Sequence, residues 1–281
     1  MFPDNPIFSL LQQEGYLTRS CLHTGFFALS KANIDNNQGD FYVAFFQLSI
    51  GLERLMKLTL ILDYLAANEL QLPNTEFLTS YQHDLTKLFR SIGAIEKRIA
   101  EQNLISDVLK QNTIESEILI FLDEFARKTR YSNLDTLTGR RSSGDPLMKW
   151  SKLSKRVFNK DVPREVKQNL KNQVIAISQI LGSNTVVMAS DLERKPLSFE
   201  DGLWQQRMFS TVAPFMIWRI MKTVYPIYKV MDEVCGLAQT VNLSLKPNEM
   251  IIPTMYEFFE FISDDRDFVL DFEQWLIKEN A

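Results

Sequence analysis

The chain has 281 residues and a formal net charge of −4, and 45% of its residues are hydrophobic while 23% are charged. A chain of this length can bury a substantial core without disulfides or metal ions, and ten glycines plus ten prolines are too few for a disordered or fibrous protein. Two distant cysteines without a paired motif suggest neither a disulfide framework nor a zinc cluster, and two histidines are too few for an imidazole-rich metal site. We therefore expect a globular protein with no metal and no cofactor.

Residues 7 to 32 have the spacing of one or two short helices, with Gly15 and Gly25 as candidate breaks. The first residues lack the basic region and apolar core of a signal peptide. In the whole chain no uncharged apolar run approaches about 18 residues. We therefore predict a cytoplasmic protein with no membrane partner.

Residues 41 to 68 form the stretch around which we expect the other helices to pack, because it is apolar on nearly every side. Asp40 is placed as its N-cap, and Asn68 lies where the apolar pattern stops. Glu53 and Lys57 are four residues apart, in the order that favours an ion pair on one helix face. The pattern predicts a buried central helix.

Three further helices are predicted in the first half of the chain. The first, over 75 to 92, carries His83, and the second, over 94 to 111, is charged and exposed after a candidate interruption at Gly93. The third covers 113 to 130 and ends in basic residues, whose charge complements the helix dipole. Glycine, serine and proline between 133 and 146 then break all periodicity and indicate a hinge or domain junction.

The second half also has helical spacing. A helix over 163 to 181 has Asp161 as its candidate cap, and the loop that follows leads into an apolar block over 204 to 243. Pro214 and Pro226 should kink this block or split it into shorter helices. Two last helices are predicted near 254 to 263 and 267 to 278.

Strand signals are few and no repeat of constant period occurs, so the sequence predicts an all-α, multi-helix bundle. We divide it into a helical bundle over 1–138, a basic linker over 139–160 and a C-terminal helical region over 161–281. The first and last of these could equally pack together as one domain.

Charge is distributed unevenly along the chain, with a basic middle and an acidic end. The basic segment could bind phosphates and stack a base. Such binding to nucleic acid should weaken steeply as the salt concentration rises. Its candidate nucleic-acid-binding residues are Arg140, Arg141, Lys149, Trp150, Lys152, Lys155 and Arg156. The alternative is a solvated linker and helix face.

The acidic C-terminal part contains many aromatic residues between 256 and 275. Aromatic side chains flanked by acids could form a surface that binds a partner protein. The alternative is that these rings belong to the core.

No P-loop, no G-x-G-x-x-G after a strand, no H-E-x-x-H and no G-x-S-x-G occurs, so the common nucleotide, metalloprotease and hydrolase motifs are absent. A di-metal carboxylate bundle would need Glu-x-x-His pairs, which two histidines do not supply. Standard motifs therefore assign no reaction to the chain.

Three segments together resemble the HEPN superfamily of helical domains, which are common in prokaryotic toxin–antitoxin and antiphage systems. These segments are AFFQLSIGLERLMKLTL at 44 to 60, YQHDLTKLF at 81 to 89 and FARKTRYSNLDTL at 125 to 137. The resemblance covers roughly the first half of the chain. It implies a helical bundle that forms a homodimer and, in many members, a metal-independent RNase with paired Arg-x(4–6)-His motifs.

The sequence departs from that motif where the chemistry would occur. Arg19 precedes His23 with only three residues between them, and no histidine follows the arginines near the end of the third predicted helix. The resemblance implies that a divergent site would combine four residues from its second and third segments. These candidate catalytic residues are His83, Arg127, Arg130 and Tyr131.

The leading prediction is a HEPN-like protein without the usual motif that binds RNA or a partner protein in a prokaryotic defence or toxin–antitoxin system. One alternative is a metal-independent endoribonuclease with a divergent site, in which histidine moves a proton and arginine stabilises the phosphate. The other is a helical scaffold or adaptor with no nucleic-acid role.

Overall fold

The computed structural model describes residues 5–34, 38–99, 103–140, 144–181 and 190–271. Within these ranges the regular structure is helical, apart from one isolated bridge between Ser190 and Pro196. This confirms the predicted all-α, multi-helix bundle. None of the described helices is long and apolar enough to cross a membrane.

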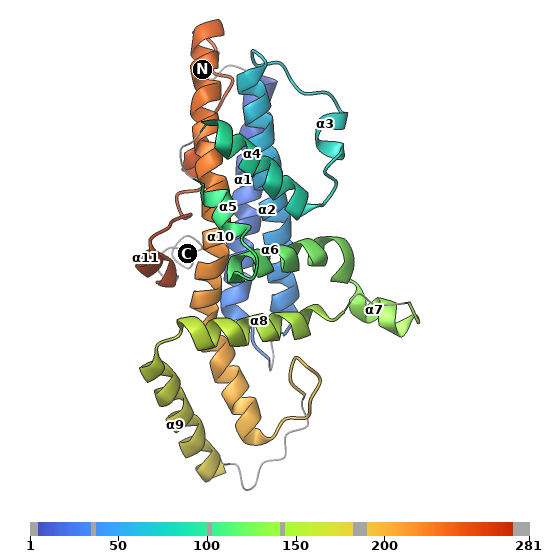
Figure 1. Cartoon of the computed structure of the whole chain (residues 1–281), viewed down its shortest axis with the longest axis vertical. Coiled ribbons are helices and arrows are strands. Elements are labelled where there is room, and N and C mark those ends of the chain that lie inside the picture. The colour runs from blue at the N-terminus through green and yellow to red at the C-terminus, as the bar shows by residue number, and fades with distance from the viewer. Residues whose placement is uncertain (1–4, 35–37, 100–102, 141–143, 182–189, 272–281) are drawn as a thin grey trace.

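Three long helices run side by side through the molecule (Figure 1). They are α1 (Pro6–Lys31), α2 (Gln38–Ala67) and α10 (Phe199–Leu245). The α2 helix lies against both of the others and buries leucines along its whole length, so the prediction of a central helix is confirmed. It begins two residues before Asp40, so this aspartate lies in the first turn and is not the predicted cap.

Glycines let α1 and α2 approach closely. A Cβ atom on Gly25 would lie 2.7 Å from Leu48 Cγ, and one on Gly51 would lie 2.7 Å from Leu22 Cδ2. Gly15 is likewise covered by Phe258. The prediction that Gly15 and Gly25 break the first helix is therefore wrong: α1 is continuous, and its glycines make room for neighbours.

The predicted helix over 75 to 92 is two helices, α3 (Glu76–Thr79) and α4 (Leu85–Ile99), because a turn separates them. Gly93 does not interrupt α4, since it lies inside the helix, opposite Ile105. The short α5 (Leu104–Val108) follows.

The third predicted helix of the first half corresponds to α6 (Ile114–Glu124), which continues as the π-helical turn η1 (Phe125–Thr129). Thr113 caps α6, because its side chain accepts a hydrogen bond from the backbone of Ser116 at 3.1 Å. The small helix α7 (Ser132–Leu137) then projects from the body of the molecule (Figure 1).

Most of the range predicted as a basic linker forms the helix α8 (Pro146–Asp161). The prediction of a linker is therefore wrong. One face of α8 is buried, and Trp150 and Val157 are only 1% and 0% exposed. The helix α9 (Arg164–Leu181) follows and packs on α10. Asp161 is the last residue of α8 and not the predicted cap of α9.

The prediction that prolines split the second apolar block is also wrong. The α10 helix is continuous through Pro214 and Pro226. A proline removes one backbone hydrogen bond from a helix, so the continuity of α10 has to be supported by tertiary contacts, and α10 packs extensively on α2.

After α10 the chain returns along the bundle through η3 (Met255–Phe258) and α11 (Arg266–Leu270). The predicted helix near 254 to 263 is only the single turn η3, and most of the one near 267 to 278 lies outside the described residues. A single cluster of buried side chains includes residues from both halves of the chain. That is the arrangement expected if the halves form one domain.

Candidate functional site

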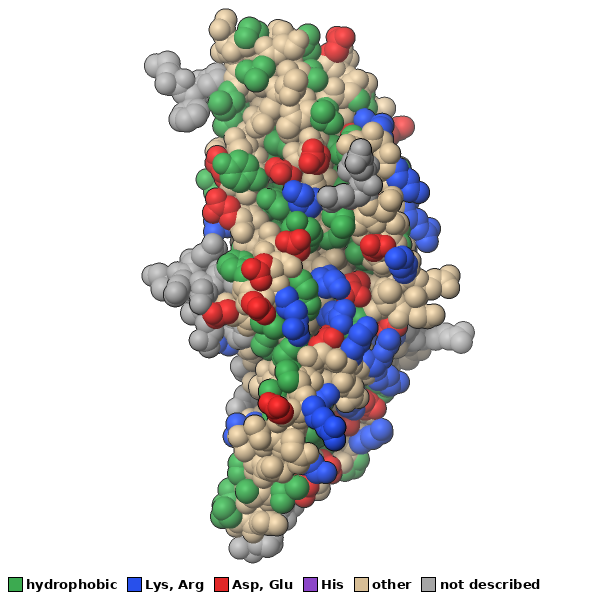
Figure 2. Space-filling model, turned by 60° about the vertical axis from the view of Figure 1, so that its left-hand side comes forward, with side chains coloured by type: hydrophobic (Ala, Val, Ile, Leu, Met, Phe, Trp, Pro, Cys, Tyr) green, Lys and Arg blue, Asp and Glu red, His purple; other side chains and the backbone are tan. Residues whose placement is uncertain are grey.

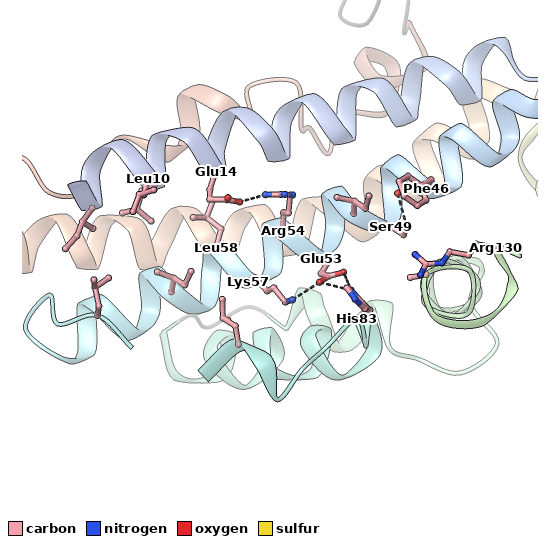
Figure 3. Close-up of a pocket in the computed structure, with 17 residues that line it drawn as sticks. Leu10, Glu14, Phe46, Ser49, Glu53, Arg54, Lys57, Leu58, His83 and Arg130 are labelled. Atoms are coloured by element: carbon pink, nitrogen blue, oxygen red, sulfur yellow. Dashed lines mark hydrogen bonds and ion pairs between the residues drawn. The ribbon is translucent and has the colours of Figure 1, made fainter. Parts of the chain in front are cut away.

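A cavity of about 600 Å³ opens between α1, α2 and the segment 72–83, which contains α3. Figure 3 shows its lining side chains, which come from these three elements and from the η1 end of α6. Volumes from about 300 to 1,000 Å³ are typical of small-molecule sites in proteins. This cavity is our candidate functional site.

One end of the cavity is lined by apolar side chains alone. They are Ile7, Leu10 and Leu11 of α1, Leu58 and Ile61 of α2, and Leu72 and Leu78 of the covering segment. Leu10 and Leu72 are 60% and 61% exposed. Two large leucines at the edge of one hollow leave apolar surface that a ligand could cover.

The middle of the cavity holds two ion pairs (Figure 3). Lys57 Nζ lies 2.6 Å from Glu53 Oε1, which confirms the ion pair predicted from their spacing. The same ammonium group donates a hydrogen bond to the carbonyl oxygen of Gln82 at 3.0 Å and so holds the covering segment against α2. The second pair joins Arg54 to Glu14 of α1 at 2.6 Å.

His83 reaches the cavity from the turn before α4. Its Nδ1 lies 3.0 Å from Glu53 Oε2, and its side chain is 67% exposed. A proton on Nδ1 would satisfy that contact and leave Nε2 as an acceptor facing solvent. Gln82, immediately before it, has a φ of 49°, a left-handed conformation that turns the chain at this point.

Arg130 lines the cavity at the end nearest Phe46 and Ala126. Its guanidinium lies 5.0 Å from the centre of the Tyr131 ring, at cation–π distance. Among the described residues it has no carboxylate partner. The structure therefore brings two of the four candidate catalytic residues, His83 and Arg130, to one cavity, and Tyr131 lies beside Arg130 outside the cavity lining.

Arg127 belongs to a different arrangement. It pairs with Asp84 at 3.1 Å and also with Asp123. Asp123 in turn accepts a hydrogen bond from the first backbone N–H of α4, at Leu85, at 2.8 Å. The hydrogen bond to Asp123 raises the pKa of Arg127 above its usual value. These contacts give Arg127 a role in joining η1 to the start of α4.

The candidate nucleic-acid-binding residues differ in what they offer to a ligand. Lys149, Lys155 and Arg156 form ion pairs with Glu124, Glu193 and Glu117, respectively. Arg140 and Lys152 are exposed, and Arg141 lies outside the described residues. Figure 2 accordingly shows Lys and Arg side chains gathered on one face with Asp and Glu among them.

Trp150 requires a correction. Its ring is 1% exposed and packs against Phe45 and Phe121, with ring centres 4.9 and 5.2 Å away. A base could not reach this ring without opening the core. Its role here is to attach α8 to α2 and α6.

The C-terminal aromatic residues are mostly buried. Phe258, Phe259 and Phe261 are between 0% and 7% exposed, whereas Tyr256 and Phe268 are 47% and 36% exposed. Phe272 and Trp275 lie outside the described residues. The alternative of core packing thus holds for the three buried rings, and the partner-protein surface stays a prediction.

The sequence did not reveal the buried charge cluster of Arg219, Asp161 and Glu115. Burial opposes the ionisation of Glu115, but the hydrogen bond from Arg219 and the nearby charge of Lys222 hold its pKa below the usual value. The available signal was Arg219, which lies between the apolar residues Trp218 and Ile220 of α10, because a buried arginine needs a buried partner. The described residues contain no group of three or more His, Cys, Asp or Glu arranged to hold a metal ion.

The chain matches no family model, no curated protein and no solved structure. The HEPN resemblance and the homodimer that it implies therefore stay predictions, and the function has to be argued from the cavity.

Proposed function

We propose that the protein is a binding protein that takes up a largely apolar ligand in the cavity between α1, α2 and the segment 72–83. The observation that carries this proposal is the apolar end of a cavity of about 600 Å³, with Leu10 and Leu72 exposed at its edge. A hollow of this size, with an apolar wall and polar groups that converge on it, is the usual form of a ligand site.

The charged groups of the cavity favour binding over a reaction. Glu53 is engaged by Lys57 and His83, and Glu14 is engaged by Arg54. Groups held in this way orient a ligand and hold the covering segment in place. The expectation for a HEPN-like protein without the usual motif was binding of RNA or a partner protein, so the apolar ligand is a separate proposal. The cytoplasmic location and the defence or toxin–antitoxin setting belong to this proposal as expectations.

Fluorescence of the neutral apolar dye N-phenyl-1-naphthylamine tests the proposal. The dye should bind the wild type, and the double variant Leu10→Glu/Leu72→Glu should bind it at least about tenfold more weakly, because it places charge in the apolar end. The matched control is Leu134→Glu/Leu137→Glu, since these α7 leucines are 60% and 83% exposed and lie outside the cavity. Equal loss in both double variants, or no binding to the wild type, would refute the proposal.

A second function is favoured by one specific observation. His83, oriented by Glu53, and Arg130, which has no carboxylate partner among the described residues, line the same cavity. In a metal-independent RNase, His83 Nε2 would take the proton from a 2′-hydroxyl as it attacks the adjacent phosphate. Arg130 would stabilise the negative charge that develops on that phosphate.

Cleavage of a mixed tRNA and mRNA pool in EDTA tests this second function. Activity that is lost in His83→Ala and in Arg130→Ala, but kept in Lys110→Ala, would support it. Lys110 is a suitable control because its side chain is 67% exposed, its ion pair is with Asp107, and it does not line the cavity. Absence of cleavage by the wild type would leave the binding role.

A further inference from the structure

We infer that the ligand of the cavity is a single-chain anionic amphiphile, with its tail in the apolar end and its anionic head between His83 and Arg130. This inference rests on the proposed binding function and specifies its ligand. It depends on the shape of the cavity, on the separation of apolar and charged residues along it, and on its charge balance.

The cavity follows one face of α2. The lining residues of α2 run from Phe46 to Ile61 at alternating intervals of three residues and one residue, which places them in one stripe. At 1.5 Å per residue, this stripe is about 22 Å long. A site that extends along one helix face suits one extended chain better than a compact, rounded ligand.

The polarity of the lining changes along that stripe. Leu10 and Leu58 lie toward the apolar end, whereas Glu53 and Lys57 lie in the charged middle (Figure 3). Ile61, Leu72 and Leu78 add further apolar side chains to the lining. A hydrocarbon tail in the apolar end would remove exposed leucine surface from water without leaving any polar group unpaired. A cavity with an apolar end and a charged part is complementary to an amphiphile, which has an apolar tail and a charged head.

The charges select the sign of the head group. The cavity is lined by three permanent cations, Arg54, Lys57 and Arg130, and by two carboxylates, Glu14 and Glu53. The carboxylates are paired with Arg54 and Lys57, so the charge of Arg130 is uncompensated within the lining. A carboxylate or sulfate head would form a charge-assisted hydrogen bond with Arg130, whereas a cationic head would be repelled.

Isothermal titration calorimetry with laurate, octanoate, dodecanol and dodecyltrimethylammonium, each below its aggregation concentration, tests the inference. Each buried methylene should strengthen binding roughly threefold to fourfold, so laurate should bind on the order of a hundredfold more tightly than octanoate. Dodecyltrimethylammonium should bind at least about tenfold more weakly than laurate.

Two variants test the position of the head group. Arg130→Gln should weaken laurate binding by about tenfold and leave dodecanol binding unchanged, because only laurate uses the charge. Lys152→Gln is the matched control, since it removes an exposed cation outside the cavity and should change neither. Circular dichroism checks that both variants keep the wild-type fold.

The outcomes separate this inference from the proposed function. If the neutral dye binds but laurate does not, or if the anionic and cationic chains bind equally, the inference of an anionic amphiphile is wrong. The cavity would then keep its binding role, with a helix of a partner protein as the occupant. If laurate binds with no effect of Arg130→Gln, the position of the head group is wrong. If neither the dye nor any chain binds, the proposed function fails and this inference fails with it.

Discussion

Arg219 of α10 and Asp161 at the end of α8 form a two-pronged ion pair, in which Nε and Nη2 each donate to one carboxylate oxygen at 2.6 Å. The remaining guanidinium nitrogen, Nη1, donates to Glu115 of α6 at 2.6 Å. The hydrogen bonds to Asp161 raise the pKa of Arg219 above its usual value, against the effect of burial. One side chain, 8% exposed, thus joins three helices.

Replacement of Arg219 by methionine should lower the free energy of unfolding by about 3 to 5 kcal/mol, because Asp161 loses its two-pronged partner and Glu115 keeps only Lys222. Lys222→Met is the matched control, since Lys222 contacts the same Glu115 at 3.2 Å but is 43% exposed. Its cost should be below about 1 kcal/mol. Urea unfolding followed by circular dichroism measures both, and similar losses would contradict this account of the cluster.

The glycines between α1 and α2 give the second prediction. Alanine at Gly25 or Gly51 should destabilise the protein by about 1 to 3 kcal/mol, because the added methyl group would overlap the facing leucine. At Gly25 the obstacle includes the backbone nitrogen of Leu48, 3.0 Å from the ideal Cβ position, so the side chain cannot simply move aside. Thermal unfolding measures the change.

Gly236 provides a control for these substitutions. It lies inside α10, and an added Cβ would meet nothing within 4 Å. Gly236→Ala should therefore stabilise the protein by about 0.5 to 1 kcal/mol through helix propensity alone. A loss at Gly236 as large as that at Gly25 would mean that close helix packing is not the cause.

The sequence predicted those parts of the fold that local patterns determine. The apolar run of α2 and the spacing of Glu53 and Lys57 needed no knowledge of distant residues. The continuity of α10 through Pro226 could not be predicted in this way, because the residues that offset the missing hydrogen bond lie on other helices. Trp150 was misinterpreted for the same reason, since basic neighbours suggested a surface where its ring is buried.

The candidate site shows the same limit. His83 and Arg130 were selected through a family resemblance, and their places in one cavity follow from the fold. Glu53 lies 30 residues before His83 in the sequence, so no local spacing could indicate their contact. The apolar end was not predicted either, because Leu10, Leu58 and Leu72 come from three separate elements of the fold.

Glu193 gives a prediction about pH. Its carboxylate accepts a hydrogen bond from Lys155 of α8 and lies 3.3 Å from Lys195, and these contacts, chiefly the first, lower its pKa from 4.5 to about 2. Because the folded-state pKa is the lower one, the stabilisation is complete above about pH 4.5 and is lost as the pH falls toward 2. The variant Glu193→Gln should therefore lose less stability over that interval than the wild type.

Urea midpoints at pH 7, 4.5 and 3 measure this difference. The variant should be less stable than the wild type at pH 7, and the gap should narrow at pH 3. Glu233→Gln on α10 is the control, since Glu233 is exposed and the described residues offer it no ion pair. If the difference in stability between the wild type and Glu193→Gln stays constant from pH 7 to 3, protonation of Glu193 does not contribute to the loss of stability in acid.

The last prediction concerns the link between Lys57 and the segment that covers the cavity. Lys57 holds Glu53 and the Gln82 carbonyl together, so Lys57→Met should release the turn that presents His83. Loss of this hydrogen bond should raise hydrogen exchange of the backbone amides at residues 80–84 by roughly fivefold or more. Lys97→Met, an exposed change on α4, should leave the same amides unaffected.

The covering segment forms one wall of the cavity, so the Lys57 variant should also bind the apolar dye more weakly. Faster exchange with unchanged dye binding would show that ligand binding does not depend on the covering segment. Unchanged exchange would show that other contacts hold the turn by themselves, such as the hydrogen bond from Lys87 to the Ser80 carbonyl at 2.8 Å.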